Sequence, residues 1–497
     1  MTRPRLVGED LSRRGFFDKV SDGLYGAALA YLLQDGCLSA AAYAADKPHS
    51  SRAEGSVPFD LTPKRPQFVP RANAVIHLCM QGGPSQVDLF DPKPALSKYH
   101  GGPPPRELTE GAIFENDRTG TLMRSPFKFA RHGKSGAWVS ELLPHIAAQV
   151  DCLAIIRSMY NVHPNHEPAI YKLQSGQTFP GHPTFGSWIA YGLGSENQNL
   201  PAYVVLADPV ERLPTNGVEN WVSGYLPPLY QGTPMRATGS PLLNLKPDYE
   251  EPASVTEVKR ELIARLDHLH QFRRPRQAVL DARISNYEMA ARMQIEATRT
   301  LDVSDETPAT LAMYGIGEPE TESFGRRCLL ARRMIERGVR FIQLFPRGQA
   351  WDNHNNIRES LPNICRKTDK PIAGLLRDLR QRGLFDSTLV LWGGEFGRLP
   401  MAQVNAAKQY VKAGRDHGPY GFTAWMAGGG VKGGTVYGNT DELGYASVEN
   451  RVSIQDWHAT ILHLMGFQHE SLVFNRNGLP ERLTHQLEAR VVDELLA

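Results

Sequence analysis

Short apolar runs rich in β-branched and aromatic residues recur along this chain, and segments with helical periodicity separate them. Such runs are too short for buried helices and are typical of strands buried on both faces. Strands that alternate with helices predict an α/β fold, in which helices cover both faces of a mainly parallel sheet. The runs are 74–80, 152–158, 203–207, 340–345, 388–392 and 423–427, and the clearest helical patterns are 324–337 and 372–382.

Polar clusters accompany these runs with unusual regularity. In a parallel α/β sheet, ligands bind beyond the carboxyl ends of the strands, where the loops converge. We therefore expect a ligand site at that edge of the sheet. Four clusters follow a run, namely Gln81–Asp88, His163–Glu167, Trp351–His354 and Gly393–Arg398, whereas Arg415–Gly418 precedes its run.

The residue types in these clusters favour a divalent cation. Imidazole and carboxylate together suit zinc, manganese, iron or magnesium, whereas a thiolate site would need clustered cysteines, which this sequence lacks. Asp352 and His354 are two residues apart, so an extended segment directs both side chains to one side. Asp416 and His417 are adjacent and converge only from an irregular loop, which the neighbouring glycines permit.

Each cluster also has a purely structural interpretation. An Asp-x-His sequence is common in turns, Glu395 among glycines can begin a helix, and Asp88 can belong to a turn. Pro164 favours a loop around His163 and His166. However, the clusters stand at strand ends, where an α/β sheet presents its ligands. This position makes a shared ligand site about as well supported as the separate structural interpretations.

The N-terminus reads as an export signal. Residues 12–17, Ser-Arg-Arg-Gly-Phe-Phe, resemble a twin-arginine signal, and a weakly apolar stretch and a small-x-small sequence at 42–44 follow. We predict a signal peptide over 1–44, a linker or arm over 45–70, and export to the periplasm or the extracellular space. An amphipathic N-terminal helix is the alternative.

The rest of the chain, residues 71–497, is predicted to form one large α/β domain. A charged segment with helical periodicity over about 251–300 indicates an inserted helical hairpin. Ser453 is expected to cap a helix that contains Asp456–Leu462. The net charge of +2 and the absence of a long apolar run argue against nucleic-acid binding and an integral membrane role.

The cysteines indicate neither a zinc ribbon nor a redox pair, because none of the five lies in a CxxC sequence. Cys37 falls within the predicted signal, which leaves four in the mature chain. These four can form up to two disulfides or remain buried thiols, and we favour thiols because Cys79 and Cys152 lie in apolar runs.

Taken together, the motifs resemble the domain-of-unknown-function family 1501, over nearly the whole mature chain. That family is similar to the alkaline phosphatase and sulfatase superfamily, whose members carry a metal-centred hydrolase site on such a sheet. The resemblance rests on the twin-arginine start and on His77–Asp88, Trp351–His354, Gly394–Arg398, Gly414–His417, Gly428–Gly434 and Asp456–Leu462.

The resemblance implies roles for several residues. Asp352 and His354 look like the superfamily's pair that binds one metal, and His417 looks like its last histidine ligand. Glu395 and Phe396 fall where the superfamily has Asp-His, so Glu395 replaces the aspartate and Phe396 removes a ligand.

Two further positions depart from the superfamily pattern. Gln81 stands where the first strand normally ends in a carboxylate, with Asp88 as the nearest replacement. His166 stands at the nucleophile position of sulfatases, and a histidine cannot form their formylglycine. Ser85 and Ser158 are the remaining candidates for a nucleophile.

We therefore predict an exported, metal-binding, hydrolase-like protein that acts on a sulfate or phosphate ester, of a small molecule or a polysaccharide, by metal-activated water. The metal is zinc, manganese, calcium or magnesium. Its candidate ligands are Asp352, His354, Glu395, Asp416 and His417. The candidate catalytic residues are His166, as base, nucleophile or further ligand, and Arg398 and Arg415, as holders of an oxyanion.

Two other functions are compatible with the same residues. A non-catalytic binding or assembly protein would keep the fold with a degenerate site. An oxidoreductase would use iron or copper bound by histidines, because histidine and carboxylate ligands do not define one metal.

Overall fold

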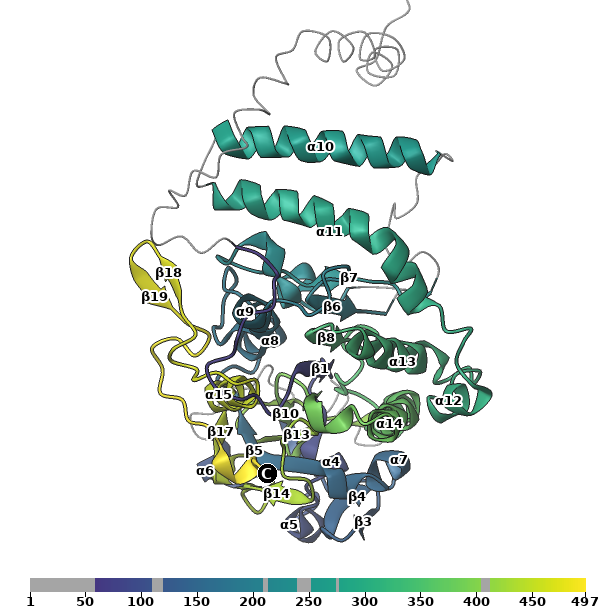
Figure 1. The fold of residues 1–497 in the computed structure, drawn as a ribbon. Coiled ribbons are helices and arrows are strands. Elements are labelled where there is room, and N and C mark those ends of the chain that lie inside the picture. The colour runs from purple at the N-terminus through teal and green to yellow at the C-terminus, as the bar shows by residue number, and fades with distance from the viewer. Residues whose placement is uncertain (1–58, 110–118, 209–212, 239–251, 274–276, 404–411) are drawn as a thin grey trace, which may run out of the picture. The chain divides into compact units, whose positions relative to one another are not determined.

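The computed structural model of this protein describes residues 59–109, 119–208, 213–238, 252–273, 277–403 and 412–497 (Figure 1). All helices and strands named below belong to one compact unit, residues 59–497. The predicted signal peptide and residues 45–58 of the predicted linker lie outside the described residues.

A nine-stranded sheet forms the centre of this unit. Its strand order is β14-β5-β13-β9-β1-β8-β6-β7, and β17 also pairs with β5. All pairings are parallel except those of β13, which runs antiparallel to β5 and β9. The strands are β1 (Ala74–Cys79), β5 (Leu153–Tyr160), β6 (Tyr203–Leu206), β7 (Thr233–Pro234), β8 (Phe341–Leu344), β9 (Thr388–Gly393), β13 (Phe422–Ala427), β14 (Thr435–Tyr437) and β17 (Val452–Ser453).

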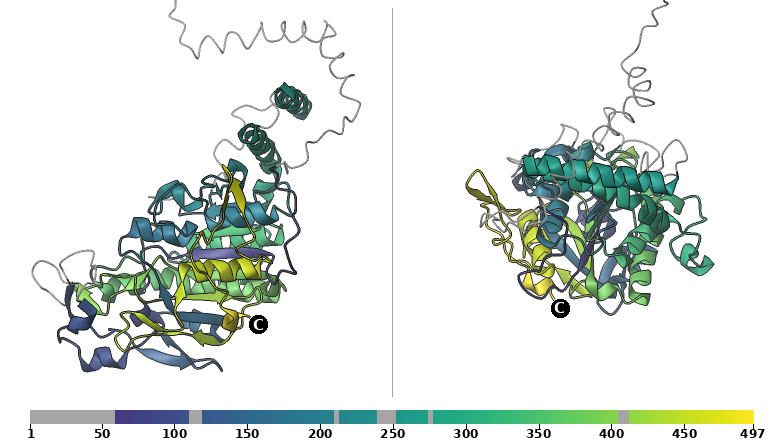
Figure 2. Two further views of the ribbon diagram at one scale, coloured as in Figure 1. Left: turned by 90° about the vertical axis from the view of Figure 1, so that its left-hand side faces the viewer. Right: turned by 45° about the horizontal axis from the view of Figure 1, so that its top comes forward.

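Helices pack on both faces of the sheet, which confirms the predicted α/β class (Figures 1 and 2). α8 (His166–Ser175), α9 (Phe185–Leu193) and α15 (Ile454–Leu464) cover one face, and α13 (Glu322–Glu336) and α14 (Ile357–Gln381) cover the other. Every residue of β1, β6, β8, β9 and β13 is consequently buried. This double coverage explains why these strands read as continuous apolar runs.

Smaller elements complete the described chain. The short helices are α4 (Gln86–Leu89), α5 (Pro94–Lys98), α6 (Arg106–Thr109), α7 (Pro144–Ala147) and α12 (Pro308–Met313), with 3-10 helices η1 (Val150–Cys152), η2 (Gly217–Trp221), η3 (Pro228–Tyr230), η4 (Phe385–Ser387) and η6 (Asp493–Leu495). The two-stranded pairs are β2 (Thr119–Leu122) with β11 (Met401–Gln403), β3 (Phe129–His132) with β4 (Ala137–Ser140), β10 (Gly397–Arg398) with β12 (His417–Gly418), β15 (Asn439–Thr440) with β16 (Ser447–Glu449), and β18 (Phe474–Arg476) with β19 (Leu479–Glu481).

Helix α14 begins fifteen residues before the helical pattern recognised in the sequence, at Ile357 instead of 372. Pro362 and Pro371 lie inside it and hide its period, because proline is normally a sign that a helix ends. The helix continues through them because its apolar side is buried, including Leu361, Ile364 and Leu375.

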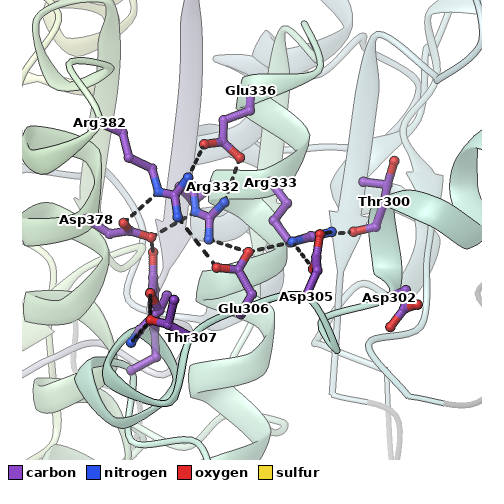
Figure 3. A network of polar contacts seen from close by, with 12 residues as sticks. Thr300, Asp302, Asp305, Glu306, Thr307, Arg332, Arg333, Glu336, Asp378 and Arg382 are labelled. Atoms are coloured by element: carbon purple, nitrogen blue, oxygen red, sulfur yellow. Dashed lines mark hydrogen bonds and ion pairs between the residues drawn. The ribbon is translucent and has the colours of Figure 1, made fainter.

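Two long helices occupy the region of the predicted insertion. They are α10 (Ala253–Arg273) and α11 (Ala278–Leu301), and α11 packs on η3 and α13. An ion-pair network ties the segment after α11 to α13 and α14 (Figure 3). In this network Arg332 of α13 binds Glu306 at 2.6 Å and Asp378 of α14 at 2.8 Å.

Two smaller predictions also hold. The Ser453 side chain accepts from the backbone nitrogen of Asp456, and the Asp456 carboxylate accepts from that of Ser453, which forms a capping box at the start of α15. The four cysteines of the described chain, Cys79, Cys152, Cys328 and Cys365, are free thiols, and all except the half-buried Cys152 are buried.

Each helix in the described ranges is too short or too polar to cross a membrane.

The direction of the strands decides where the polar clusters meet. β1, β5, β8 and β9 are mutually parallel in the sheet, so the loops after them leave from the same edge. β13 runs the opposite way, so its cluster reaches this edge by preceding the strand. This reversal explains the one cluster that stands before its run in the sequence.

Candidate metal centre

Four side chains from three segments meet at this edge of the sheet. His166 is the first residue of α8, Asp352 and His354 lie in the loop between β8 and α14, and His417 begins β12. Each offers one ligand atom, and these atoms all lie within 4.8 Å of one another. We call these four residues the histidine–aspartate cluster.

Two glycines allow the loops to approach so closely. A Cβ atom at Gly82, where φ is +110°, would overlap the backbone nitrogen of Asp352. A Cβ atom at Gly414 would overlap the backbone of Asn353 and His354. Any larger residue at either position would push the Asp352–His354 loop away from its neighbours.

The three imidazoles converge on one oxygen. Their Nε2 atoms lie 2.9 Å (His354), 3.2 Å (His417) and 3.4 Å (His166) from Oδ1 of Asp352. The ring centroid of His417 lies 4.3 Å from that of His166 and 4.6 Å from that of His354. The same oxygen binds the guanidinium of Arg398 at 2.5 Å.

The opposite nitrogen of each ring, Nδ1, already has an acceptor. Nδ1 of His166 donates to Oε1 of Glu395 at 2.6 Å, and Nδ1 of His417 donates to the Pro164 carbonyl at 2.7 Å. Nδ1 of His354 contacts the side-chain oxygen of Gln403. Carbonyl and carboxylate oxygens only accept, so these contacts hold the proton on Nδ1 and leave Nε2 facing the cluster.

Burial and charge set the protonation of the cluster. Burial raises the pKa of Asp352, but the Arg398 guanidinium, together with His166 and His354, outweighs it and holds that pKa far below its usual range. Burial lowers the pKa of His417 to about 3, so this ring is neutral at pH 7. Burial also lowers the pKa of His166 and His354, but their hydrogen bonds to Asp352 outweigh it, helped by Glu395 for His166, whose pKa rises to about 9.

This donor set fits a divalent cation. In neutral His417, the Nε2 lone pair faces the ionised oxygen of Asp352 at 3.2 Å, so two acceptors are in contact without a proton between them. A cation bound by both atoms would remove that repulsion. Imidazole nitrogens held by a partner at the other nitrogen, together with a carboxylate, are the usual ligands of zinc and related ions.

Two of the predicted ligands, Glu395 and Asp416, lie behind the histidines of the cluster and contact them there. Glu395 is fully buried, and besides His166 it accepts from the backbone nitrogen of Gly82 at 2.9 Å. Oδ1 of Asp416 accepts from the backbone nitrogen of His417 and lies 3.8 Å from Nδ1 of His354. Both carboxylates therefore contact histidines of the cluster on the side away from Asp352.

The two predicted arginines occupy different places. Arg398 is fully buried and donates to the carbonyls of Gly82, Gly83, Trp351 and Arg415 as well as to Asp352. The Arg415 guanidinium instead forms a buried ion pair with Asp88, at 2.6 and 3.1 Å. Arg398 thus joins the loops at the cluster, whereas Arg415 holds the neighbouring segment.

The positions where the sequence departs from the superfamily pattern lie beside the cluster. The Phe396 ring packs against His417 and His166, with centroids 4.5 and 4.9 Å away. Gln81 donates to Asn220 at 2.8 Å. The hydroxyls of Ser85 and Ser158 donate elsewhere, to Asp88 and to the Asn450 carbonyl.

Of the three partners of the Nδ1 atoms, the sequence marked only Glu395, as a candidate ligand. Pro164 stood within a recognised cluster, but only its carbonyl takes part. Nothing in the sequence marked Gln403 as a site residue, because it belongs to β11, far from His354 along the chain, and only the folded structure brings the two side chains together. The exposed side of the cluster is formed by Asp352 and His354, whose side chains are each 21% exposed, whereas that of His417 is 0% exposed.

Comparison with known proteins agrees with the resemblance seen in the motifs. Residues 72–496 match the family described as "Protein of unknown function (DUF1501)". No curated protein matches the chain.

Several solved structures are similar. Ps i-CgsB is 10% identical with a TM-score of 0.35, over 81% of this chain and 72% of that chain. The PsFucS1 sulfatase from Pseudoalteromonas sp. is 12% identical with a TM-score of 0.33, over 80% and 68%. The alkaline phosphatase from the Antarctic bacterium TAB5 is 12% identical with a TM-score of 0.29, over 72% and 92%.

Proposed function

This chain belongs to the DUF1501 family, whose description assigns no function, and we propose from its own cluster that it binds one divalent cation and hydrolyses an anionic ester. One observation carries the proposal. Nε2 of a buried, neutral histidine, His417, faces an ionised carboxylate oxygen, that of Asp352, with two more imidazoles at the same point. Such an arrangement is stable when a cation lies among these atoms.

The donors favour some metals over others. Calcium and magnesium prefer sets made of oxygen atoms, and magnesium keeps several waters. A set of imidazole nitrogens with one carboxylate suits zinc, manganese or iron. We propose that Asp352, His354 and His417 hold the cation, because catalytic zinc sites use three protein ligands and keep one position open.

The bound cation would supply the nucleophile, because it lowers the pKa of a bound water to about 7. The residues of the chain do the rest. Asp352 and His354 form the exposed side, from which an ester can approach. Arg398 keeps Asp352 ionised and holds the loops together.

His166 is proposed to deliver a proton. Glu395 holds Nδ1 of His166 at 2.6 Å and so keeps the ring oriented, and Nε2 lies 3.4 Å from Oδ1 of Asp352 and faces the cluster. From this position Nε2 would donate a proton to the leaving oxygen of the ester. The substrate we propose is a sulfate or phosphate ester, on a small molecule or a polysaccharide. Export through the predicted twin-arginine signal also belongs to this proposal.

The test measures bound metal and turnover in the same variants. The purified chain should hold about one divalent ion by elemental analysis and should hydrolyse 4-nitrophenyl phosphate or 4-nitrophenyl sulfate. His417→Ala and Asp352→Ala should lose both the ion and the turnover. His166→Ala should keep the ion and lose at least ~100-fold in kcat. His268→Ala, at an exposed position of α10, is the matched control and should change neither.

Three outcomes would contradict parts of this proposal. Turnover that survives removal of the ion by a chelator would exclude the cation from the chemistry. Loss of the ion in His166→Ala would make His166 a fourth ligand instead of a proton donor. Bound iron or copper with a visible absorption band and no hydrolysis would favour the oxidoreductase.

A second candidate is a protein that binds the cation without catalysis. The observation that favours it is the histidine at the position which the resemblance gives to the nucleophile, with the hydroxyls of Ser85 and Ser158 bonded elsewhere. A stably bound ion without turnover of either ester would support this candidate.

A further inference from the structure

A groove of about 980 Å³ lies between the β3–β4 hairpin, α5 and the β15–β16 hairpin. None of the four residues of the histidine–aspartate cluster lines it. Its walls come from segments that the proposed hydrolysis does not use.

One wall of the groove is aromatic. In β3–β4, Arg131 pairs with Trp138, and Phe129 lies two residues from Arg131, so these three side chains share one face of the hairpin. The opposite face carries Ala137 and Val139, which are buried in the core. Trp138 is 37% exposed, and the Arg131 guanidinium lies 5.1 Å from its ring centroid, which restrains the ring.

The floor of the groove is polar and already ordered. Asp91 is 1% exposed and binds Lys93 at 3.0 Å and Arg157 at 3.5 Å. Thr440 donates to the second oxygen of Asp91, and Arg157 also donates to Asn439. Nε of Arg157 is buried and has no hydrogen-bond partner among the described residues.

The charges that line the groove nearly cancel. Three cationic side chains, Lys93, Arg131 and Arg157, face four carboxylates, of which Asp91, Asp441 and Glu449 are already bonded within the protein. This balance does not favour an anion. An exposed aromatic wall opposite fixed hydrogen-bonding side chains suits a sugar, whose C–H face packs on a ring while its hydroxyls bond at the edges.

We propose that this groove binds a neutral polysaccharide, with Trp138 as the ring on which a sugar stacks. An open groove of this size accommodates several sugar units of a continuing chain. The proposal is independent of the proposed hydrolysis, because the groove does not include the cluster.

The experiment is native electrophoresis of the full chain in gels that contain mixed-linkage β-glucan, xyloglucan or galactomannan, with a carrageenan gel as the anionic comparison. The chain should be retarded in at least one neutral gel. Trp138→Ala and Phe129→Ala should each weaken the apparent affinity at least ~10-fold, by loss of ring contact. Trp138→Phe should retain most of it.

Two further variants complete the design. Tyr287→Ala removes an aromatic residue that is 72% exposed on α11, outside the groove, and should bind like the unmodified chain. Asp352→Ala disables the cluster and should also bind normally, which separates this proposal from the hydrolysis.

The proposal is overturned if no neutral gel retards the chain, or if only carrageenan does. It is equally overturned if both Trp138→Ala and Phe129→Ala, with unchanged thermal melting, bind as well as the unmodified chain. Retardation that Asp352→Ala abolishes would place the sugar at the cluster and not in the groove.

Discussion

Each histidine of the cluster has one nitrogen occupied by the protein itself. Nδ1 of His166 contacts a carboxylate, Nδ1 of His417 a backbone carbonyl, and Nδ1 of His354 an amide oxygen. Such partners orient an imidazole and make the other nitrogen a better ligand or proton carrier. The residues behind the cluster therefore matter for its chemistry as much as those that face the ligand.

Glu395→Gln tests this role at the scale of one residue. The substitution keeps the shape but removes the negative charge that holds the proton of His166. The raised pKa of His166 should fall, and the kcat for ester hydrolysis should drop by at least ~10-fold, with a larger loss for esters with poor leaving groups.

The matched control is Glu261→Gln, at an exposed ion pair of α10. It should leave kcat and its leaving-group dependence unchanged. Equal rates for Glu395→Gln and the unmodified chain would show that the carboxylate only packs against the ring.

At the scale of elements, α13 and α14 are joined by charge as well as by apolar packing. Arg332 on α13 is 1% exposed and binds Glu306 and Asp378, with Glu336 one turn further along its own helix (Figure 3). Removing one member of a buried ion-pair network leaves the others charged and without compensation. The network therefore couples α13 and α14 to the segment that follows α11.

Arg332→Ala should lower the free energy of unfolding by about 3 kcal/mol. Urea denaturation measures this change. Arg326→Ala is the matched control, because Arg326 is on the same helix and binds Glu322 in a partly exposed pair. The control should cost less than about 1 kcal/mol, and similar losses in both variants would contradict the special role of the buried network.

At the scale of the whole molecule, stability at low pH depends on buried neutral histidines. Burial is the main cause that lowers the pKa of His77 and of His458 to about 3. Both rings pack on Phe185, with centroids 5.1 and 5.4 Å away. The unfolded chain binds a proton at each below its ordinary pKa of about 6.5, and the folded chain does not until about pH 3.

The free energy of unfolding should therefore fall as the pH drops from 6.5 towards 3, by up to ~1.4 kcal/mol per pH unit for each histidine. His458→Gln removes one titrating group and can still donate to the Leu173 carbonyl that His458 contacts. Urea unfolding between pH 4 and 6 should show a shallower slope in this variant. His268→Gln, at an exposed position, serves as control and should keep the slope of the unmodified chain. Identical slopes in all three proteins would refute this account.

Much of the fold was predictable because its signals are local. A buried strand such as β1 or β9 shows itself as a short apolar run, whatever it pairs with. The capping box of Ser453 is equally local. Helix α14 was predicted too short because its two prolines indicate the end of a helix. Burial of its apolar side keeps the helix continuous in spite of them.

The sequence alone thus determined the α/β class, the strands and the residue types that gather at their ends. Only the tertiary structure decided which of these residues meet. It reversed β13 and so brought His417 to the cluster, and it joined His166 to Glu395 across 229 residues of chain. It also directed the Arg415 guanidinium to Asp88 and not to the cluster, while Arg398 contacts Arg415 at its carbonyl. The physical reason is that strand order and direction depend on which long-range pairings bury the most surface, and periodicity along the chain carries no record of them.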